Sequence, residues 1–331
     1  AQRQEFTLFY GKDVTRRHVD QPITISDGYE GMAVDNGLLK VHLDRDNFRP
    51  LQSIWLDGNA DRAYADNERL TDGHGPGIVL TAPDGSIFQA HRTRMRTRVE
   101  QRGPLRACIR LEGKHQGKNG HLFGYVARLH IFRGRPFVRF DYTFVNDNTP
   151  RMVSAVKSLE LGISLAGKGP FQRHLQGPQK ETARLFQLDD RQFHLNGQPG
   201  GRQAAGWVSL SGTRGEVAVG VRHFWQNWPK GLSVQDKSLR LELLPAFADG
   251  TYDGRPIREE CMLYYYLRKG QYTFKIGASR THEVWARFSA KPAGANGNTS
   301  FFQAIDQRLL AQVAPSPCPH HLHMIVNRQM K

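Results

Sequence analysis

One segment of the sequence concentrates side chains that commonly bind sugars. Residues 220–231 read Gly-Val-Arg-His-Phe-Trp-Gln-Asn-Trp-Pro-Lys-Gly, which brings indoles, amides and basic groups together in a short run. Indole rings stack on the apolar faces of sugars, amides bond hydroxyl groups, and a cation pairs with the carboxylate of a uronic acid. The alternative is that Phe224 and Trp225 are core residues at a sheet corner and Lys230 is an exposed turn lysine. For the whole segment, which we call the tryptophan motif, we favour a ligand surface.

A second segment places arginines at every other position. These are Arg92, Arg94, Arg96 and Arg98. On a strand, alternate side chains project from one face about 6.6 Å apart, and guanidinium groups bind carboxylate, sulfate or phosphate bidentately. Arginines between Arg106 and Arg139 on the following strands would extend this face. The alternative is cross-strand neutralisation by Glu100, Glu112 and Asp141.

Other catalytic and metal-binding motifs are missing from the sequence. It contains no GxSxG, HExxH, Walker-A or GxGxxG pattern, so serine hydrolases, zinc proteases and nucleotide-binding enzymes lack support. The turn at Asp44, Asp46 and Asn47 offers oxygen ligands but lacks the glycine and distal glutamate of a complete calcium loop, and we expect a hairpin turn there. The cysteines lie far apart and form no CxxC pair. We predict neither a metal nor a cofactor.

The elements that must position these residues are strands. Period-2 alternation and turn dipeptides run through most of the chain, and helical patterns are scarce before its last ~30 residues. We predict strands within residues 37–55, 78–81, 87–99, 105–112, 122–132, 136–146, 153–165, 207–210, 217–225, 232–234, 239–244, 261–267 and 282–288. In residues 136–146 polar and apolar side chains alternate, which predicts one solvent-exposed polar face and one apolar face. The predicted fold is all-β: a large antiparallel β-sandwich, supersandwich-like, with a short helical or irregular C-terminal tail.

Composition shifts predict where this sandwich begins and ends. We expect lead-in strands in residues 1–30, the β-sandwich in residues 31–290, and a linker and C-terminal tail in residues 291–331. The linker prediction rests on the run Lys-Pro-Ala-Gly-Ala-Asn-Gly-Asn-Thr-Ser that follows Ala290. Within the sandwich, residues 58–77 collect Asp, Asn, Gly and Pro without periodicity, and we expect a long surface loop there.

The charge of the chain points to a polyanionic partner. The chain of 331 residues has 46 Lys and Arg against 31 Asp and Glu, a formal net charge of +15. Such a balance favours nucleic acid, an acidic polysaccharide or an anionic membrane surface, although a charged surface that binds nothing is the alternative. No stretch approaches the ~20 apolar residues of a membrane helix, and no nucleic-acid-binding module is recognisable. An acidic polysaccharide is therefore the expected partner, with no membrane and with nucleic acid a lesser alternative.

Several strand phrases and the tryptophan motif together resemble a known family. Residues 100–113, 129–134 and 138–145, followed by Arg-His-Phe-Trp-Gln-Asn-Trp-Pro-Lys at 222–230, resemble the central β-sandwich of exo-rhamnogalacturonan lyase-like proteins. The resemblance covers roughly residues 30–290, and the tryptophan motif is its most specific part. Members of that family typically have a small β-barrel before the sandwich and a helical α/α toroid after it, and their lyase site is thought to lie between sandwich and toroid. This sequence shows neither, so the resemblance implies carbohydrate binding more directly than catalysis.

The resemblance implies β-elimination of a uronic-acid polymer of the rhamnogalacturonan type. That reaction needs a cation at the uronate carboxylate, a base for the C5 proton and an acid for the departing O4. Carried over from the tryptophan motif, Lys230 would be the carboxylate partner or the base. As a base it would need burial or a neighbouring cation, Arg222 or His223, to lower its pKa. His223 and the tyrosines at 264–266 are the candidates for the acid.

The remaining site residues are expected to bind the polymer. Trp225 and Trp228 would stack on sugar rings, Gln226 would bond hydroxyl groups, and the rest of the substrate-binding set is Arg222, Arg92, Arg94 and Arg96. The strand pair His282-Glu283 brings further polar groups but ranks below the motif. Two other functions stay open: a non-catalytic carbohydrate-binding fragment of a larger enzyme, and nucleic-acid binding through the arginine-rich face. Family habit and the start of the sequence favour a secreted or periplasmic protein.

Overall fold

The computed structural model describes residues 3–8, 12, 14–15, 18–256, 258, 265–307, 310–313 and 322–327. The chain divides into a larger unit, Gln21–Ala295, and a smaller one formed by Ala1–Asp20 with Asn296–Lys331. Among the helices described, none has the length and apolar character that a membrane crossing requires.

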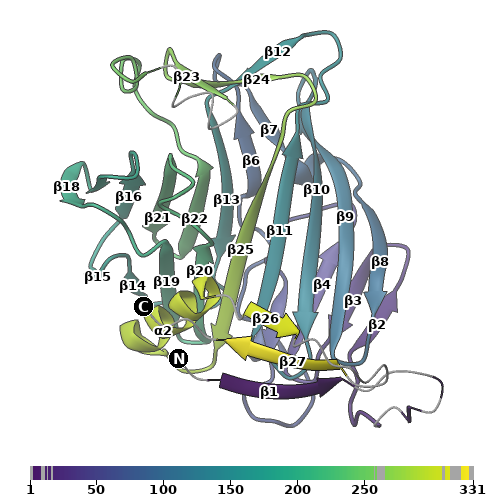
Figure 1. The fold of residues 1–331 in the computed structure, drawn as a ribbon. Helices are drawn as coiled ribbons and strands as arrows, with labels where there is room; N and C mark the ends of the chain where they lie inside the picture. The colour runs from purple at the N-terminus through teal and green to yellow at the C-terminus, as the bar shows by residue number, and fades with distance from the viewer. Residues whose placement is uncertain are drawn as a thin grey trace. The chain divides into compact units, whose positions relative to one another are not determined.

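The larger unit is built on antiparallel strands that pair in two runs (Figure 1). In spatial order, the first run is β8 (Arg96–Arg102), β9 (Arg106–Gly117), β10 (Gly120–Phe132), β11 (Phe137–Val145), β25 (Ser279–Ser289), β20 (Gly215–Val221), β19 (Trp207–Gly212), β14 (Gln172–His174) and β15 (Pro178–Gln179). The second run is β7 (Ile87–Gln89), β6 (Gly77–Thr81), β13 (Ser158–Ser164), β22 (Ser238–Leu244), β21 (Lys230–Gln235), β16 (Ala183–Gln187), β17 (Phe193–Leu195) and β18 (Gln198–Gly201).

These two runs are the sheets of a β-sandwich. β19 and β20 of the first sheet contact β22 of the second, and the edges meet where Gln89 of β7 pairs with Gln116 of β9. The prediction of an all-β antiparallel sandwich is therefore confirmed.

Smaller sheets complete the described structure. In the larger unit, β2 (Thr24–Asp27), β3 (Gly31–Asp35), β4 (Leu39–Asp44) and β5 (Ile54–Leu56) form one sheet, and β12 (Val153–Val156), β24 (Gln271–Lys275) and β23 (Tyr266–Arg268) form another. Two short 3-10 helices lie at η1 (Asp66–Glu68) and η2 (Ala90–Arg92). In the smaller unit β1 (Arg3–Leu8), β27 (Leu322–Asn327) and β26 (Leu310–Val313) form a sheet. The helix α2 (Gly294–Asp306) begins within the run expected as a linker.

Strand β11 shows why the first sheet forms. Its apolar residues Val138, Phe140, Tyr142 and Phe144 are all buried, whereas the polar residues between them are half-buried. Each buried aromatic ring removes enough apolar surface from water to contribute about 2–3 kcal/mol. One face of the sheet therefore packs into the core and the other presents polar side chains.

Two predicted strands are shorter than expected. The predicted strand at 87–99 is interrupted by η2. Ala90 and Met95 are five positions apart, so a continuous strand would place them on opposite faces. Both are buried, and the break at η2 allows this. The predicted strand at 217–225 ends at Val221. Its continuation is a turn closed by the Asn227 N–H donating to the His223 carbonyl at 3.0 Å, and this turn carries the buried Phe224 into the core.

Candidate functional site

The polar side chains of the first sheet gather on the face opposite the core. The cross-strand register aligns Arg98, Arg110, Arg128, Asp141 and Glu283 in one row across β8, β9, β10, β11 and β25. We call this surface the polar face; its charged members include Arg96, Arg98, Glu100, Arg110, Glu112, Arg128, Arg139, Asp141 and Glu283. The sequence correctly predicted that arginines of β9, β10 and β11 share this face.

Carboxylates neutralise the middle of the polar face. Glu100 lies 2.7 Å from Arg128 and 3.5 Å from Arg110, and the hydrogen bond from Arg128 lowers the pKa of Glu100. Arg139 donates to Asp141 at 2.7 Å. By contrast, within the described part of the chain the exposed side chains of Arg96 and Arg98 form no hydrogen bond or ion pair. Carboxylates on neighbouring strands thus neutralise the arginines at the middle of the polar face, whereas its β8 edge keeps uncompensated positive charge.

The predicted row of four arginines is only half formed. Arg92 belongs to η2, and Arg94 lies in the segment between η2 and β8, so neither continues the strand. Arg94 pairs with Asp46 and lies over the ring of Tyr29 at 4.4 Å. The 3-10 turn breaks the alternation on which the prediction depended, and Arg96 and Arg98 alone share a face of β8.

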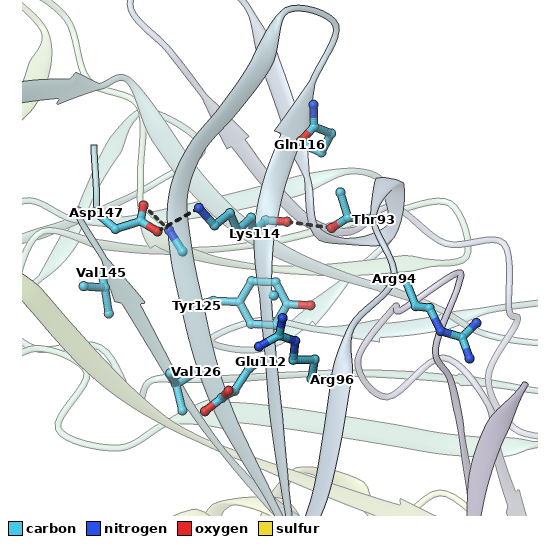
Figure 2. Close-up of a pocket in the computed structure, with 12 residues that line it drawn as sticks. Thr93, Arg94, Arg96, Glu112, Lys114, Gln116, Tyr125, Val126, Val145 and Asp147 are labelled. Carbon is cyan, nitrogen blue, oxygen red and sulfur yellow. Dashed lines mark hydrogen bonds and ion pairs between the residues drawn. The ribbon is translucent and has the colours of Figure 1, made fainter. Parts of the chain in front are cut away.

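A pocket of about 490 Å³ opens at the β8 edge of the polar face (Figure 2). We call it the cationic pocket; it is lined by Thr93, Arg94, Arg96, Glu112, Gly113, Lys114, Gln116, Gly124, Tyr125, Val126, Val145 and Asp147. Lys114 lies 3.5 Å from Asp147, which also accepts the Gly124 N–H at 2.9 Å. Two of the predicted substrate-binding arginines, Arg94 and Arg96, therefore lie together at one pocket.

The cationic pocket also holds a buried hydroxyl group that sequence reasoning missed. Tyr125 is 2% exposed, and no described residue forms a hydrogen bond with its hydroxyl. The ring passes over Gly113, where a Cβ atom would overlap the hydroxyl; in Figure 2 it lies at the centre of the residues that line the pocket. Burial raises the pKa of Tyr125, so the group stays protonated and can donate.

A second pocket, of about 220 Å³, lies beside the turn of the tryptophan motif. We call it the loop pocket; it is lined by Arg139, Asp141, Val221, Arg222, His223, Asn227, Thr281, His282 and Glu283. Glu283 accepts a hydrogen bond from Trp285 at 2.9 Å and lies 3.3 Å from Arg222 and 3.7 Å from Arg139. His223 is exposed at φ +53°, a conformation that costs energy for a residue other than glycine.

Lys230 lies in the core behind the tryptophan motif and lines neither pocket. It is fully buried, and its Nζ donates to the carbonyls of Leu243 at 2.7 Å and Pro229 at 3.2 Å. Burial, then the positive charge of Arg280, lowers the pKa of Lys230 well below its usual value. A lowered pKa is what a role as base would require, but the neighbouring cation is Arg280 instead of Arg222 or His223. In this position the amine cannot touch a polysaccharide, which corrects the expectation of direct contact.

His282, which ranked below the tryptophan motif in the sequence analysis, is a buried residue at the loop pocket. It lines the loop pocket, is 3% exposed, and its Nε2 has no hydrogen-bond partner among the described residues. Burial and the charges of Lys230 and Arg280 lower the pKa of His282 well below its usual value, so the imidazole is neutral at pH 7. Its position beside Glu283 on a strand was the only signal in the sequence.

The other residues of the tryptophan motif divide between surface and core. Gln226 is exposed and Trp225 is half-buried. Trp228 is 9% exposed and packs on Tyr252, with ring centroids 6.0 Å apart, so it is a core residue in this structure and does not present a stacking face to a sugar. Among the predicted acids, Tyr265 is buried and Tyr264 lies outside the described residues.

The two pockets lie on the same sheet face. Val145 lines the cationic pocket and Asp141 lines the loop pocket, and both belong to β11. Four residues of strand separate them, which is about 14 Å along one face. Thr143 lies between them and bonds Thr281 of β25 at 2.7 Å. A ligand that reaches both pockets must be an oligomer.

Comparison with known proteins gives one family. The profile described as "PcRGLX-like protein central beta sandwich domain" matches residues 23–186 and 188–240, and no curated protein matches the chain. Similar solved structures include a galactose mutarotase related enzyme from Lactobacillus acidophilus (13% identity, 79% of this chain and 98% of that chain, TM-score 0.42). A second is a putative aldose 1-epimerase from Klebsiella pneumoniae (10% identity, 92% of this chain and 95% of that chain, TM-score 0.45). A third is an alpha-mannosidase from Enterococcus faecalis (9% identity, 83% of this chain and 31% of that chain, TM-score 0.43). At these TM-scores the likenesses say nothing about what this chain does.

Proposed function

Because the chain belongs to the PcRGLX-like central β-sandwich family, we propose that its polar face binds an acidic polysaccharide of the rhamnogalacturonan type. A chain of alternating neutral and uronic-acid sugars presents carboxylates at intervals along an extended polymer. The polar face offers cations and hydrogen-bond donors at two pockets on one strand, which suits such a ligand. A secreted or periplasmic location is part of the proposal, because the polymer lies outside the cell.

The observation that carries this proposal is the unpaired charge at the cationic pocket. Arg96 has no acidic partner among the described residues, while Glu112 is taken by Arg110 and Asp147 by Lys114. One free cation fits one uronate unit, whose carboxylate pairs with the guanidinium.

The loop pocket is where β-elimination would take place. In that reaction a base removes the C5 proton, the C4–C5 double bond forms, the C4–O4 bond breaks, and O4 takes up a proton. His223 is exposed at the pocket and can exchange protons with a bound sugar. His282 lies in register with the core-facing Tyr142 and is 3% exposed, so it does not contact a bound sugar directly. Arg139 and Arg222 lie where they can stabilise charge on the uronate, in competition with Glu283.

In this proposal Lys230 is a positioning residue. Its buried amine donates to the carbonyls of Leu243 and Pro229. Arg280 donates to the Asn227 side chain at 3.0 Å, which ties the turn of the tryptophan motif to β25.

Elimination is tested by ultraviolet absorbance, because the product carries an unsaturated uronate. Rhamnogalacturonan I, polygalacturonan and a glucuronate-containing gum are the substrates, and His223→Asn is the variant, since asparagine tolerates the positive φ at this position. We expect a rise with rhamnogalacturonan I that the variant loses while it still binds the polymer. An equal rise in the variant would remove His223 from the mechanism.

The main alternative is a carbohydrate-binding domain without catalysis. The loop pocket favours this alternative because its Arg222 already donates to Glu283, which partly neutralises the pocket. Binding of rhamnogalacturonan I without any absorbance change would establish it. Nucleic-acid binding through Arg96 and Arg98 is a third hypothesis; it requires an affinity for any DNA that falls steeply with salt.

A further inference from the structure

The loop that follows β5 brings three carboxylates together. One carboxylate oxygen from each of Asp57, Asp61 and Glu68 lies within 4.8 Å of those of the other two. Asp57 directly follows β5 and Glu68 ends η1. Within the described part of the chain, none of the three forms an ion pair with a basic side chain. Three negative charges therefore converge without a cation from the protein.

The environment of Asp57 indicates that the three carboxylates bind a ligand. It is 5% exposed, and its Oδ2 accepts the Arg62 N–H at 3.0 Å. Its Oδ1 is buried and has no hydrogen-bond partner among the residues described. Buried carboxylate oxygens are normally hydrogen-bonded or bound to a metal, because burial without a partner is costly. A cation held between the three carboxylates would satisfy Oδ1 and balance the charge.

The spacing of the ligands matches a calcium loop. Counted from Asp57 as the first position, Asn59, Asp61 and Glu68 occupy the third, fifth and twelfth positions, which supply side-chain ligands in the twelve-residue EF-hand loop. The sixth position there is glycine, because the chain must turn sharply. Here it is Arg62, which nevertheless adopts φ +65°. The turn that glycine normally permits is thus present in this loop.

We propose that residues 57–68 bind a divalent cation of the Ca²⁺ type through the carboxylates of Asp57, Asp61 and Glu68. Ca²⁺ prefers oxygen ligands at about 2.3–2.6 Å, so oxygens on opposite sides of the ion lie about 4.6–5.2 Å apart. The three carboxylate oxygens lie within 4.8 Å of one another, so a single ion between them could contact all three. The proposal is independent of polysaccharide binding and replaces the sequence-based prediction that the chain holds no metal.

The full chain, freed of metal with a chelator, is titrated with CaCl₂ in a calorimeter. We expect one ion per chain, with an affinity at least tenfold weaker in both Asp61→Asn and Glu68→Gln. Asp61 is exposed, so its variant should fold even where a change at the buried Asp57 does not. The matched control is Asp84→Asn, an exposed carboxylate in the turn between β6 and β7 that should leave the affinity unchanged.

Thermal unfolding gives a second measurement on the same proteins. Ca²⁺ should raise the Tm of the wild type and of Asp84→Asn, and shift the Tm of Asp61→Asn and Glu68→Gln much less, because a ligand stabilises only the state that binds it. MgCl₂ should bind at least tenfold more weakly than CaCl₂. The proposal is overturned if millimolar CaCl₂ produces neither heat nor a Tm shift, if both loop variants bind as the wild type does, or if Mg²⁺ binds equally well.

Discussion

The buried His115 of β9 should make folding stability depend strongly on pH. The residue is fully buried, its Nδ1 lies 2.9 Å from the Phe123 carbonyl oxygen, and its Nε2 contacts the Tyr142 hydroxyl. A carbonyl oxygen only accepts, so Nδ1 carries the hydrogen and Nε2 accepts from Tyr142. Burial lowers the pKa of His115 to about 4. The folded protein therefore holds this imidazole neutral across the whole range from pH 7 to about pH 5.

The size of the effect follows from the two pKa values. The unfolded chain takes up a proton at His115 below about pH 6.5, and the folded chain does so only near pH 4. The contribution of the neutral His115 to the free energy of unfolding is thus present above pH 6.5 and is lost as the pH falls toward 4. The gap from 6.5 to 4, at about 1.4 kcal/mol per unit, amounts to about 3 kcal/mol. About 2 kcal/mol of this disappears between pH 7 and pH 5.

Urea unfolding of the wild type and His115→Gln at pH 7 and pH 5 measures this effect. Glutamine can still donate to the Phe123 carbonyl but does not titrate, so the variant isolates the protonation step from the loss of packing. We expect the wild type to lose about 2 kcal/mol more than the variant between the two pH values. Parallel losses in both proteins would refute the assignment of a neutral, buried His115.

Three further variants test other parts of the structure. Gly113→Ala should lower the free energy of unfolding by about 1–3 kcal/mol, because the new Cβ overlaps the buried Tyr125 ring; Gly254→Ala, with open space at its Cβ position, is the control in the same urea experiment. Arg62→Gly should tighten Ca²⁺ binding in calorimetry, because glycine adopts φ +65° without strain; weaker binding would contradict the loop geometry. Lys230→Met should abolish a rise in stability between pH 7 and pH 10 that the wild type shows, since the lowered pKa of the buried amine favours its neutral form; curves of equal slope would contradict this.

Local alternation predicted the sheets well because burial of one strand face dictates it. The polar and apolar residues of β11 separate onto opposite faces, as the pattern indicates. The register that aligns Arg110 with Arg128 follows from the same burial, because a shift by one residue would move charged side chains into the core. The sharing of one face by these arginines could therefore be predicted from the sequence.

Departures from alternation were harder to predict. The run of arginines from Arg92 to Arg98 alternates perfectly, yet Ala90 and Met95 must both reach the core and break the strand. Alternation in the sequence does not reveal which neighbouring sheet will take up a small apolar side chain. Packing between distant segments decided the local structure here.

The sequence could not show which side chains of the tryptophan motif are buried and which are exposed. A lysine and two indoles in a short motif indicate a sugar site, but the sequence cannot show that Lys230 and Trp228 face inward while Trp225 does not. His282 lies on a strand far along the chain, and only the fold brings it to the loop pocket. The acidic loop does not match a complete calcium-loop pattern in the sequence, because Arg62 stands where such a loop normally has glycine.

Charge recognition on the polar face is the central claim, and a binding titration tests it most directly. Rhamnogalacturonan I oligosaccharides are compared with the same oligosaccharides after their carboxylates are reduced to alcohols. The acidic ligand should bind at least tenfold more tightly. Arg96→Gln should weaken acidic binding about threefold to tenfold, whereas Arg202→Gln, an exposed arginine beyond β18, should not. Equal affinity for the acidic and reduced oligosaccharides would contradict the claim.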